Sequence, residues 1–327
     1  MSIGPNRRAF IGGFGAAVTW PLAAHGQQRV KVHRLGVLLF STPSTDPTLK
    51  IVHSSLNALG YVEGRDLIFA YRYAEGHPER LAELAAALVQ EKPDLLIALG
   101  GDVAPSAVKA TSTIPIVFLS SADPVELGLV ASLSRPATNA TGVTLLLDDT
   151  ASKRLELLKE TVPRVQQVAF LWNPEHLDNE VREAQRAAQS LKVRLRFIEL
   201  HGAGELGGAL QTITDAGCDA LYVVSSRQTL LNLSRIVEFS TANHLPLAGG
   251  WGAWARSGGL LAYGPNVDDI SKRLVTYIDK IIKGAKPADL PVQQPTKFEL
   301  VINAKAAKTL GITVPPSVLA RADEVIE

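Results

Sequence analysis

Short apolar runs that alternate with segments of helical spacing constrain the fold of this chain most. The runs are HRLGVLLF, DLIFAYRY, DLLIALGG, IPIVFLSS and ATGVTLLL in the first half, and QQVAFLWN, VRLRFIEL, ALYVVSS, LPLAGG and GLLAYG in the second. Between them lie amphipathic segments such as NEVREAQRAAQSLK. Runs of this length are typical of buried strands, and parallel strands require crossover helices between them. The pattern therefore predicts an α/β fold with two doubly wound parallel-sheet lobes.

Residues 266–327 continue beyond the point at which both lobes are complete. The first lobe is predicted to span residues 29–147 and the second residues 148–262. A further helix is predicted over NVDDISKRLVTYIDKIIKG and a further strand over PTKFELVIN. We therefore expect residues 266–290 to return to the first lobe and residues 296–327 to return to the second. Crossings of this kind make a multi-segment hinge between the lobes.

The N-terminal segment 1–26 has the layout of an export signal. Arg7 and Arg8 precede an apolar run, and Ala24 and Gly26 are the small residues expected before a cleavage site near Gly26. The arginine pair is similar to the twin-arginine class of signals, whose cargo crosses the inner membrane folded, and a general secretory signal is the alternative. We expect the mature protein to be periplasmic, soluble and monomeric.

Charge and composition argue against two function classes. The chain has 33 Lys and Arg residues against 32 Asp and Glu residues and no long basic run, which argues against a nucleic-acid partner. After the export signal no apolar run reaches the length of a membrane span, which argues against a membrane enzyme. The 46% of apolar residues is enough for a substantial hydrophobic core.

The candidate ligand-binding residues lie where predicted strands end. In open parallel sheets, ligands bind beyond the carboxyl ends of the strands, near backbone N–H groups and helix N-termini. Small hydroxyl residues and glycines dominate these positions, and this composition suits ligand capture better than turnover. The candidates are Ser41, Thr42, Gly100, Gly101, Ser120, Ser121, Asp123 and Thr144 in the first lobe, and Asn173, Ser225, Ser226, Gly250 and Tyr263 in the second. Trp172, Trp251 and Trp254 lie near strand ends of the second lobe, where they would pack in the core or stack on a ligand.

Signatures of catalysis are absent from the sequence. No G-x-S-x-G elbow, Walker phosphate loop or H-E-x-x-H metal helix occurs, and we predict no metal and no cofactor. Gly202 to Gly207 match G-x-G-x-x-G, but the next strand ends in two serines instead of the acid that holds a ribose. A nucleophilic role for Ser120 or Ser121 requires a base within hydrogen-bond reach, and no nearby motif supplies one. An exported α/β hydrolase or isomerase that uses Ser120 or Ser121 is the alternative to a binding protein.

The stretch FLSSADPV joins a predicted strand to a predicted helix. Asp123 followed by Pro124 is typical of a helix start, so a helix is predicted over PVELGLVASL. If the ligand is an amino acid, we expect Ser120, Ser121 and nearby backbone N–H groups to hold its carboxylate. Asp123 would then be available for its ammonium group.

Four stretches give the chain a specific resemblance to a known family. They are LGYVEGRDLIFAYRYAEGHPERLAELAAALV, IPIVFLSSADPVELGLVASLSRPATNATGVT, ELLKETVPRVQQVAFLWNP and the tail from Tyr263 to Glu327. Together they resemble the tryptophan/tyrosine-type substrate-binding proteins of bacterial ABC importers. The likeness covers nearly the full chain, including the export signal.

The resemblance implies a type I periplasmic binding fold that closes over a small ligand without catalysis. It also implies delivery of the ligand to an inner-membrane permease that a separate ATPase drives. Two departures bear on the ligand: the hydroxyls of Ser120 and Ser121 favour a polar head group, and VVSSRQT has serines where relatives often have an aspartate. An amino acid is the leading ligand class. A sensor that docks on a membrane receptor is a further alternative.

Overall fold

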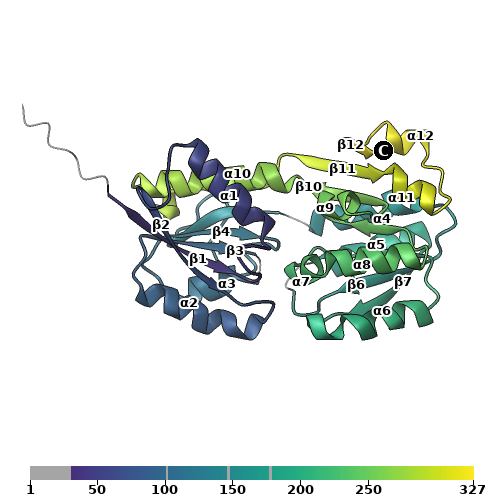
Figure 1. Cartoon of the computed structure of the whole chain (residues 1–327), viewed down its shortest axis with the longest axis horizontal. Coiled ribbons are helices and arrows are strands. Elements are labelled where there is room, and N and C mark those ends of the chain that lie inside the picture. The colour runs from purple at the N-terminus through teal and green to yellow at the C-terminus, as the bar shows by residue number, and fades with distance from the viewer. Residues whose placement is uncertain (1–30, 101, 146–147, 177–178) are drawn as a thin grey trace, which may run out of the picture. The chain divides into compact units, whose positions relative to one another are not determined.

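The computed structural model describes residues 31–100, 102–145, 148–176 and 179–327. Val32–Glu327 form one compact unit that contains a five-stranded and a seven-stranded β-sheet (Figure 1). The segment 1–26, predicted to be an export signal, lies outside the described residues. No helix in the described part of the chain is long and apolar enough to cross a bilayer.

The first sheet is wholly parallel, with strand order β2-β1-β3-β4-β5. Its strands are β1 (His33–Leu39), β2 (Leu67–Tyr73), β3 (Leu95–Leu99), β4 (Ile116–Ser120) and β5 (Ala140–Thr144). The helices that follow its strands are α1 (Pro47–Ala58), α2 (Leu81–Gln90) and α3 (Ala104–Ala110). β3 and β4 are buried throughout, as expected of continuous apolar runs covered on both faces. The strand order reverses between β1 and β3, which is where a ligand site is expected in such a sheet.

The second sheet repeats this order and adds two strands. Its order is β7-β6-β8-β9-β10-β11-β12. The strands are β6 (Gln167–Trp172), β7 (Arg194–Glu199), β8 (Ala220–Val223), β9 (Leu247–Gly249), β10 (Leu261–Pro265), β11 (Phe298–Asn303) and β12 (Glu324–Ile326). Its helices are α4 (Asp148–Thr161), α5 (Glu180–Leu191), α6 (Leu206–Asp215), α7 (Arg227–Leu231), α8 (Leu233–Ala242), α9 (Gly252–Arg256), α11 (Ala304–Thr309) and α12 (Pro316–Leu319). The predicted fold class is thus confirmed, although β11 runs antiparallel to β10.

The chain crosses between the two sheets more than once. Helix α10 (Val267–Ile282) follows β10 but packs against α1 and against β3, β4 and β5 of the first sheet. Tyr61 donates to Asp279 on α10 (2.8 Å), and burial together with this hydrogen bond raises the pKa of Tyr61 to about 12, so the phenol remains a donor at neutral pH. After α10, Gln293 pairs with β5 through Gly142 and Thr144 before the chain enters β11. These crossings tie the lobes together at one side.

The predicted helix over PVELGLVASL is wrong. Pro124 to Gly128 form turns, closed by bonds from Gly128 N–H to the Val125 carbonyl (3.0 Å) and from Leu129 N–H to the Pro124 carbonyl (2.9 Å). Gly128 has φ +68°, a left-handed conformation that ends a helical turn and that glycine adopts readily. Asp123 accepts from Val125 N–H (2.7 Å) and stabilises this single turn.

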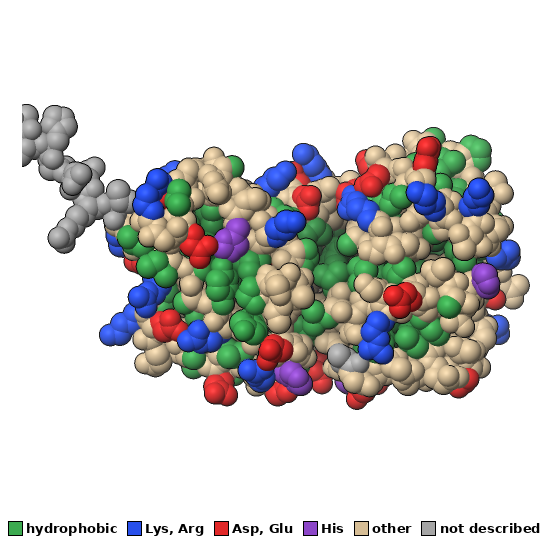
Figure 2. Space-filling view, viewed as in Figure 1, with side chains coloured by type: hydrophobic (Ala, Val, Ile, Leu, Met, Phe, Trp, Pro, Cys, Tyr) green, Lys and Arg blue, Asp and Glu red, His purple; other side chains and the backbone are tan. Residues whose placement is uncertain are grey.

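Charged side chains of both signs are interspersed over the face shown in Figure 2. Apolar side chains are visible in the hollow between the two lobes (Figure 2). This arrangement gives no extended patch of one sign on this face, and such a patch is what steers a protein to a polyanion.

Gly142 on β5 provides a test of the close packing between β4 and β5. Gly142 lies opposite Phe118, and a Cβ added at Gly142 would overlap the Phe118 carbonyl oxygen. We expect Gly142→Ala to lower the free energy of unfolding by about 1–3 kcal/mol, because the strands must separate to accept the methyl group. Gly208 in α6 has no atom within 4 Å of an added Cβ, so Gly208→Ala is the control and should raise stability by up to about 1 kcal/mol. Urea unfolding measures both, and equal stability of the two variants would contradict this packing.

Candidate functional site

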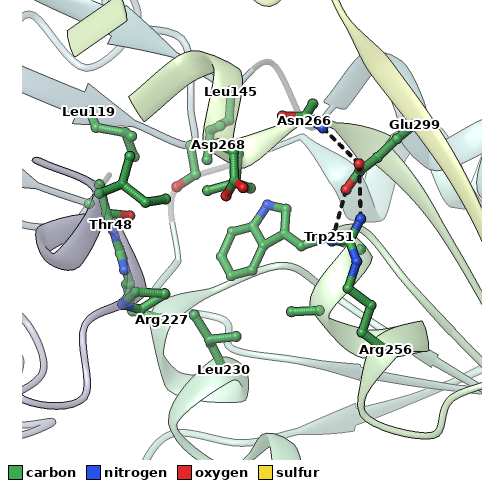
Figure 3. A pocket seen from close by; sticks show the side chains of 17 residues that line it. Thr48, Leu119, Leu145, Arg227, Leu230, Trp251, Arg256, Asn266, Asp268 and Glu299 are labelled. Carbon is green, nitrogen blue, oxygen red and sulfur yellow. Dashed lines mark hydrogen bonds and ion pairs between the residues drawn. The ribbon is translucent and has the colours of Figure 1, made fainter. Parts of the chain in front are cut away.

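A cavity of about 130 Å³ lies where the carboxyl ends of strands from both sheets meet (Figure 3). Since one water needs roughly 10–15 Å³ on this scale, the cavity has room for on the order of ten non-hydrogen atoms. Its apolar lining includes Pro47, Ile51, Leu119, Leu145, Leu230 and Trp251. Its polar lining includes Thr48, Ser121, Arg227, Arg256, Asn266, Asp268 and Glu299. An apolar enclosure with a few polar groups is typical of small-molecule sites.

Trp251 provides the largest apolar surface of the cavity. It follows β9 directly, is 6% exposed, and its ring lies between Leu230 and Asp268 in Figure 3. The indole Nε1 has no hydrogen-bond partner in the described structure. A buried N–H without an acceptor costs roughly 1–3 kcal/mol, so this group would gain from an acceptor that a ligand brings.

A buried ionic network supports the loop that carries Trp251. Arg154 on α4 pairs with Glu180 on α5, donates to the Tyr222 hydroxyl (2.5 Å) and donates to the Tyr263 carbonyl (3.1 Å). Gly250 packs directly on this network, and a Cβ at Gly250 would overlap the Ser225 hydroxyl. Breaking a buried pair of this kind typically costs 3–5 kcal/mol, so the network fixes the backbone from Gly250 onward.

The charges at one end of the cavity belong to the second lobe and to α10. Arg256 pairs with Glu324 (2.7 Å) and Glu299 (3.2 Å), and the hydrogen bond to Glu324 raises the pKa of Arg256, so the guanidinium stays charged. Asn266 donates to Glu299 (2.7 Å) and caps α10. Asp268, in the first turn of α10, lines the cavity without an ion pair or hydrogen bond to any side chain of the described residues. Asp268 is therefore a cavity carboxylate without a cationic partner among the described residues.

A buried ion pair closes the opposite end of the cavity and joins the lobes. Arg227 Nη1 on α7 donates to Asp46 Oδ2 (2.9 Å), and the two side chains are 8% and 0% exposed. Asp46 also caps α1 by accepting from Leu49 N–H (3.1 Å) and accepts from the Ser41 hydroxyl (3.2 Å). In Figure 3, Arg227 lies beside Thr48, on the side of the cavity away from Arg256.

A second set of polar contacts joins the lobes at Ser121. The Ser121 hydroxyl lies 3.3 Å from His176 Nε2, and His176 Nδ1 lies 2.9 Å from Asp102 Oδ1. Ser121 and Asp102 follow β4 and β3 of the first sheet, whereas His176 follows β6 of the second. No pattern in the sequence pointed to this histidine, because only the tertiary fold brings residue 176 to residue 121.

The chain matches a family model described as ABC transporter substrate binding protein over residues 35–326. The chain belongs to this family. A curated relative, a tyrosine-binding protein of Clostridioides difficile (strain R20291), is 24% identical over 276 residues, which cover 84% of this chain and 79% of the relative. The family match of this chain confirms the resemblance that the sequence suggested.

Two solved structures are similar over 90% of this substrate-binding protein and over 100% of their own chains. One is a conserved domain protein from Vibrio cholerae, with 30% identity and a TM-score of 0.82. The other is an ABC domain in complex with L-Trp from Streptococcus pneumonia, with 27% identity and a TM-score of 0.81. The type I periplasmic binding fold expected from the sequence is therefore confirmed.

Among the residues predicted from the first lobe of this substrate-binding protein, Gly100 and Ser121 line the cavity. Ser41 bonds to Asp46, and Thr42 bonds to Thr45 within its own loop. The hydroxyls of Ser120 (2.9 Å) and Thr144 (3.3 Å) both lie at the Ala122 carbonyl, and Asp123 holds the turn already described. Gly101 lies outside the described residues.

The five residues predicted from the second lobe are not among those that line the cavity. Asn173 accepts from Glu175 N–H (2.9 Å), and Ser226 caps α7. The Ser225 hydroxyl has no hydrogen-bond partner among the described residues, and Gly250 packs on it. The Tyr263 carbonyl accepts from Arg154 and its ring stacks near Phe298. The roles of all these residues in ligand binding stay predictions.

Sequence reasoning missed Arg227, Asp46 and Asp268, which lie within a few residues of strand ends. Small residues at strand ends were the expected lining, because a ligand approaches their backbone closely, whereas these three charged side chains were not among the candidates. Arg227 directly follows the predicted pair Ser225-Ser226, so its position at a strand end was a usable signal.

The adjacent serines at the end of β8 provide a matched pair for a stability test. Ser226 accepts from Thr229 N–H in a capping box, so Ser226→Ala should cost about 1 kcal/mol of unfolding free energy. Ser225 is equally buried, but its hydroxyl has no partner in the part of the chain that the structure describes, so Ser225→Ala should be neutral or slightly stabilising. Chemical unfolding of the ligand-free protein distinguishes them. A larger loss from Ser225→Ala than from Ser226→Ala would show that these roles are reversed.

Proposed function

We propose that this substrate-binding protein captures a small polar ligand, an amino acid, between its two lobes in the periplasm. It then delivers the ligand to the permease of an ABC importer in the inner membrane. In this proposal residues 1–26 direct export, and the protein acts as a monomer without catalysis. Residues 29–147 with 266–290 form one lobe, and residues 148–262 with 296–327 form the other. The crossings between β5, α4, β10, α10 and β11 serve as the hinge.

The observation that carries the proposal is the cavity shared by the two lobes. Thr48, Leu119 and Ser121 reach it from the first lobe, and Arg227 and Trp251 reach it from the second. A ligand there is in contact with both lobes, so its binding energy favours the closed arrangement over the open one. The closed shape is then what a permease distinguishes from the free protein.

The distribution of polar groups supports an amino acid as the ligand. Arg227 offers hydrogen-bond donors at one side of the cavity, and Asp268 offers an unneutralised carboxylate at another. Leu119, Leu145 and Trp251 supply apolar surface to the same cavity. An α-amino acid with an apolar side chain supplies a carboxylate, an ammonium and apolar surface to match. The tyrosine-binding relative and the neighbour solved with L-Trp have ligands of this class.

Asp268 and Asp269 are neighbours that differ in their partners, and they provide a test of the ammonium site. Asp268 lines the cavity, whereas Asp269 pairs with Arg273 (2.8 Å) and Lys297 (3.2 Å). We expect Asp268→Asn to weaken binding of L-tryptophan or L-tyrosine by about 10- to 100-fold, because a charge-assisted hydrogen bond is lost. Asp269→Asn should leave the affinity within about twofold. Isothermal titration calorimetry measures both.

A screen of natural L-amino acids by thermal shift comes first in this experiment. Binding raises the melting temperature by mass action, so an amino acid that is bound tightly gives a clear shift. No shift with any amino acid at millimolar concentration would contradict the ligand class. Equal losses in the two variants would contradict the assigned role of Asp268.

Hydrolysis is a second candidate function, and one observation favours it. Ser121, His176 and Asp102 follow one another at hydrogen-bond distances in the order of an acyl-transfer triad. His176 is therefore a base within reach of Ser121, which no motif near this serine had indicated. However, His176 and Ser121 lie in different lobes, so opening of the lobes for ligand entry would separate nucleophile and base.

Ester hydrolysis distinguishes the two functions. With p-nitrophenyl acetate and with aminoacyl p-nitrophenyl esters, a binding protein should show no turnover above that of the Ser121→Ala variant. Turnover that both Ser121→Ala and His176→Gln abolish, in variants that remain folded by circular dichroism, would establish the hydrolase instead.

A further inference from the structure

Arg227 lines the cavity in addition to pairing with Asp46, and the ion pair alone does not explain this position. It is 8% exposed, lines the cavity and packs against Gly100 of the first lobe, where an added Cβ would lie 3.4 Å from Nε. Gly100 has φ +130°, a conformation that other residues rarely adopt, so a glycine there both permits the turn and leaves room for the side chain.

The ion pair uses only part of the hydrogen-bonding capacity of Arg227. A guanidinium has five N–H donors, and in the described structure only Nη1 has an acceptor, Asp46 Oδ2 at 2.9 Å. Buried guanidinium donors are strongly favoured to find an anionic acceptor, and carboxylates match their fork geometry. Pro47 and Thr48, the first residues of α1, line the cavity, and Thr48 lies next to this guanidinium (Figure 3).

We propose that Arg227 couples recognition of a carboxylate on the ligand to closure of the lobes, a role that rests on the proposed function as a binding protein. In the closed protein one edge of the guanidinium holds Asp46 across the lobes, and its remaining donors hold the carboxylate of the ligand. Arg227 is thus both a selectivity group, which requires a carboxylate, and the link between the ligand and the first lobe.

Desolvation explains why the link depends on the ligand. Closure removes both Arg227 and Asp46 from water, and such a cost is recovered only when the remaining donors are also satisfied. A carboxylate satisfies them, whereas an amine leaves them unpaired and adds a like charge. Asp46 keeps its bonds to Leu49 N–H and Ser41 when the lobes separate, because these partners belong to its own lobe. The pair is therefore made on closure and is not needed to fold either lobe.

The ligand chemistry is tested with three probes of one shape: L-tryptophan, indole-3-propionate and tryptamine. Indole-3-propionate keeps the carboxylate and lacks the ammonium group, and tryptamine has the reverse. We expect calorimetry with the wild-type protein to show binding of L-tryptophan, weaker binding of indole-3-propionate, and binding of tryptamine at least about 100-fold weaker than that of L-tryptophan. Tryptamine binding within a factor of three of L-tryptophan would overturn the proposal.

The coupling is tested with Arg227→Gln, Asp46→Asn and the double variant. Asparagine caps a helix as well as aspartate does, so Asp46→Asn removes the charge and keeps the α1 cap. We expect Arg227→Gln to weaken binding of the carboxylate probes by about 100-fold and Asp46→Asn to weaken it by about tenfold. In the Arg227→Gln background, Asp46→Asn should have an effect of less than about twofold, because the two residues act as one unit.

Arg227→Lys provides a second variant in case Arg227→Gln folds poorly. A lysine keeps the charge but lacks the planar fork, so it can pair with Asp46 or with the ligand but not with both. We therefore expect Arg227→Lys to lower the affinity for the carboxylate probes by about tenfold, an intermediate loss. Small-angle scattering should show that L-tryptophan compacts the wild-type protein and compacts Asp46→Asn less at the same fractional saturation. Additive losses in the double variant, or unchanged affinity in Arg227→Gln, would overturn the coupling.

The probes also separate this inference from the proposed ligand class. If indole-3-propionate binds as tightly as L-tryptophan and Arg227→Gln abolishes both, the role of Arg227 is supported and the amino acid assignment fails. If L-tryptophan binds and depends on Asp268 but not on Arg227, the amino acid assignment is supported and this inference is overturned.

Discussion

The site depends on parallel strand pairing in both sheets. The first sheet has the order β2-β1-β3-β4-β5, and the second repeats it as β7-β6-β8-β9-β10. Each parallel strand must be followed by a crossover, so every loop after a strand emerges at the same edge of its sheet. The two edges face a common cavity, and most of its lining comes from the segments that follow β1, β3, β4, β5, β8, β9 and β10, with Leu119 of β4 and Glu299 of β11 in addition. A ligand there would meet short loops and the first residues of four helices, α1, α7, α9 and α10.

Buried charge is concentrated around this cavity and has two separate uses. Arg154 and Glu180 lie wholly within the second lobe and fix the backbone at Gly250, directly before Trp251. Arg227 and Asp46 lie in different lobes and meet at the cavity wall. A buried pair within one lobe persists in any arrangement of the lobes, whereas a pair between lobes exists only when they are closed. The same physical interaction therefore gives rigidity in one place and a conformational dependence in the other.

The sequence predicted most of the fold and only part of the site. Alternating apolar and amphipathic segments predicted the strands and helices, and the segment 266–284 was predicted as a helix, where α10 is found. The prediction of a helix after Asp123 was wrong. Gly128 adopts a left-handed conformation, which its surroundings determine, and this conformation ends the helical turn after Asp123. Ser120 and Ser121 looked equivalent in sequence, but successive side chains after a strand point in different directions. Only Ser121 therefore lines the cavity, and Ser120 bonds to Ala122.

By itself, the sequence determined the α/β class, the doubled arrangement and the sheet edge at which the cavity lies, because strand length, period and crossover all follow from local patterns of apolar residues. Only the tertiary structure decided which side chains meet there. Arg227 and Asp46 are 181 residues apart, and Ser121 and His176 are 55 apart. No local pattern encodes such pairs, because each depends on how the two lobes face one another.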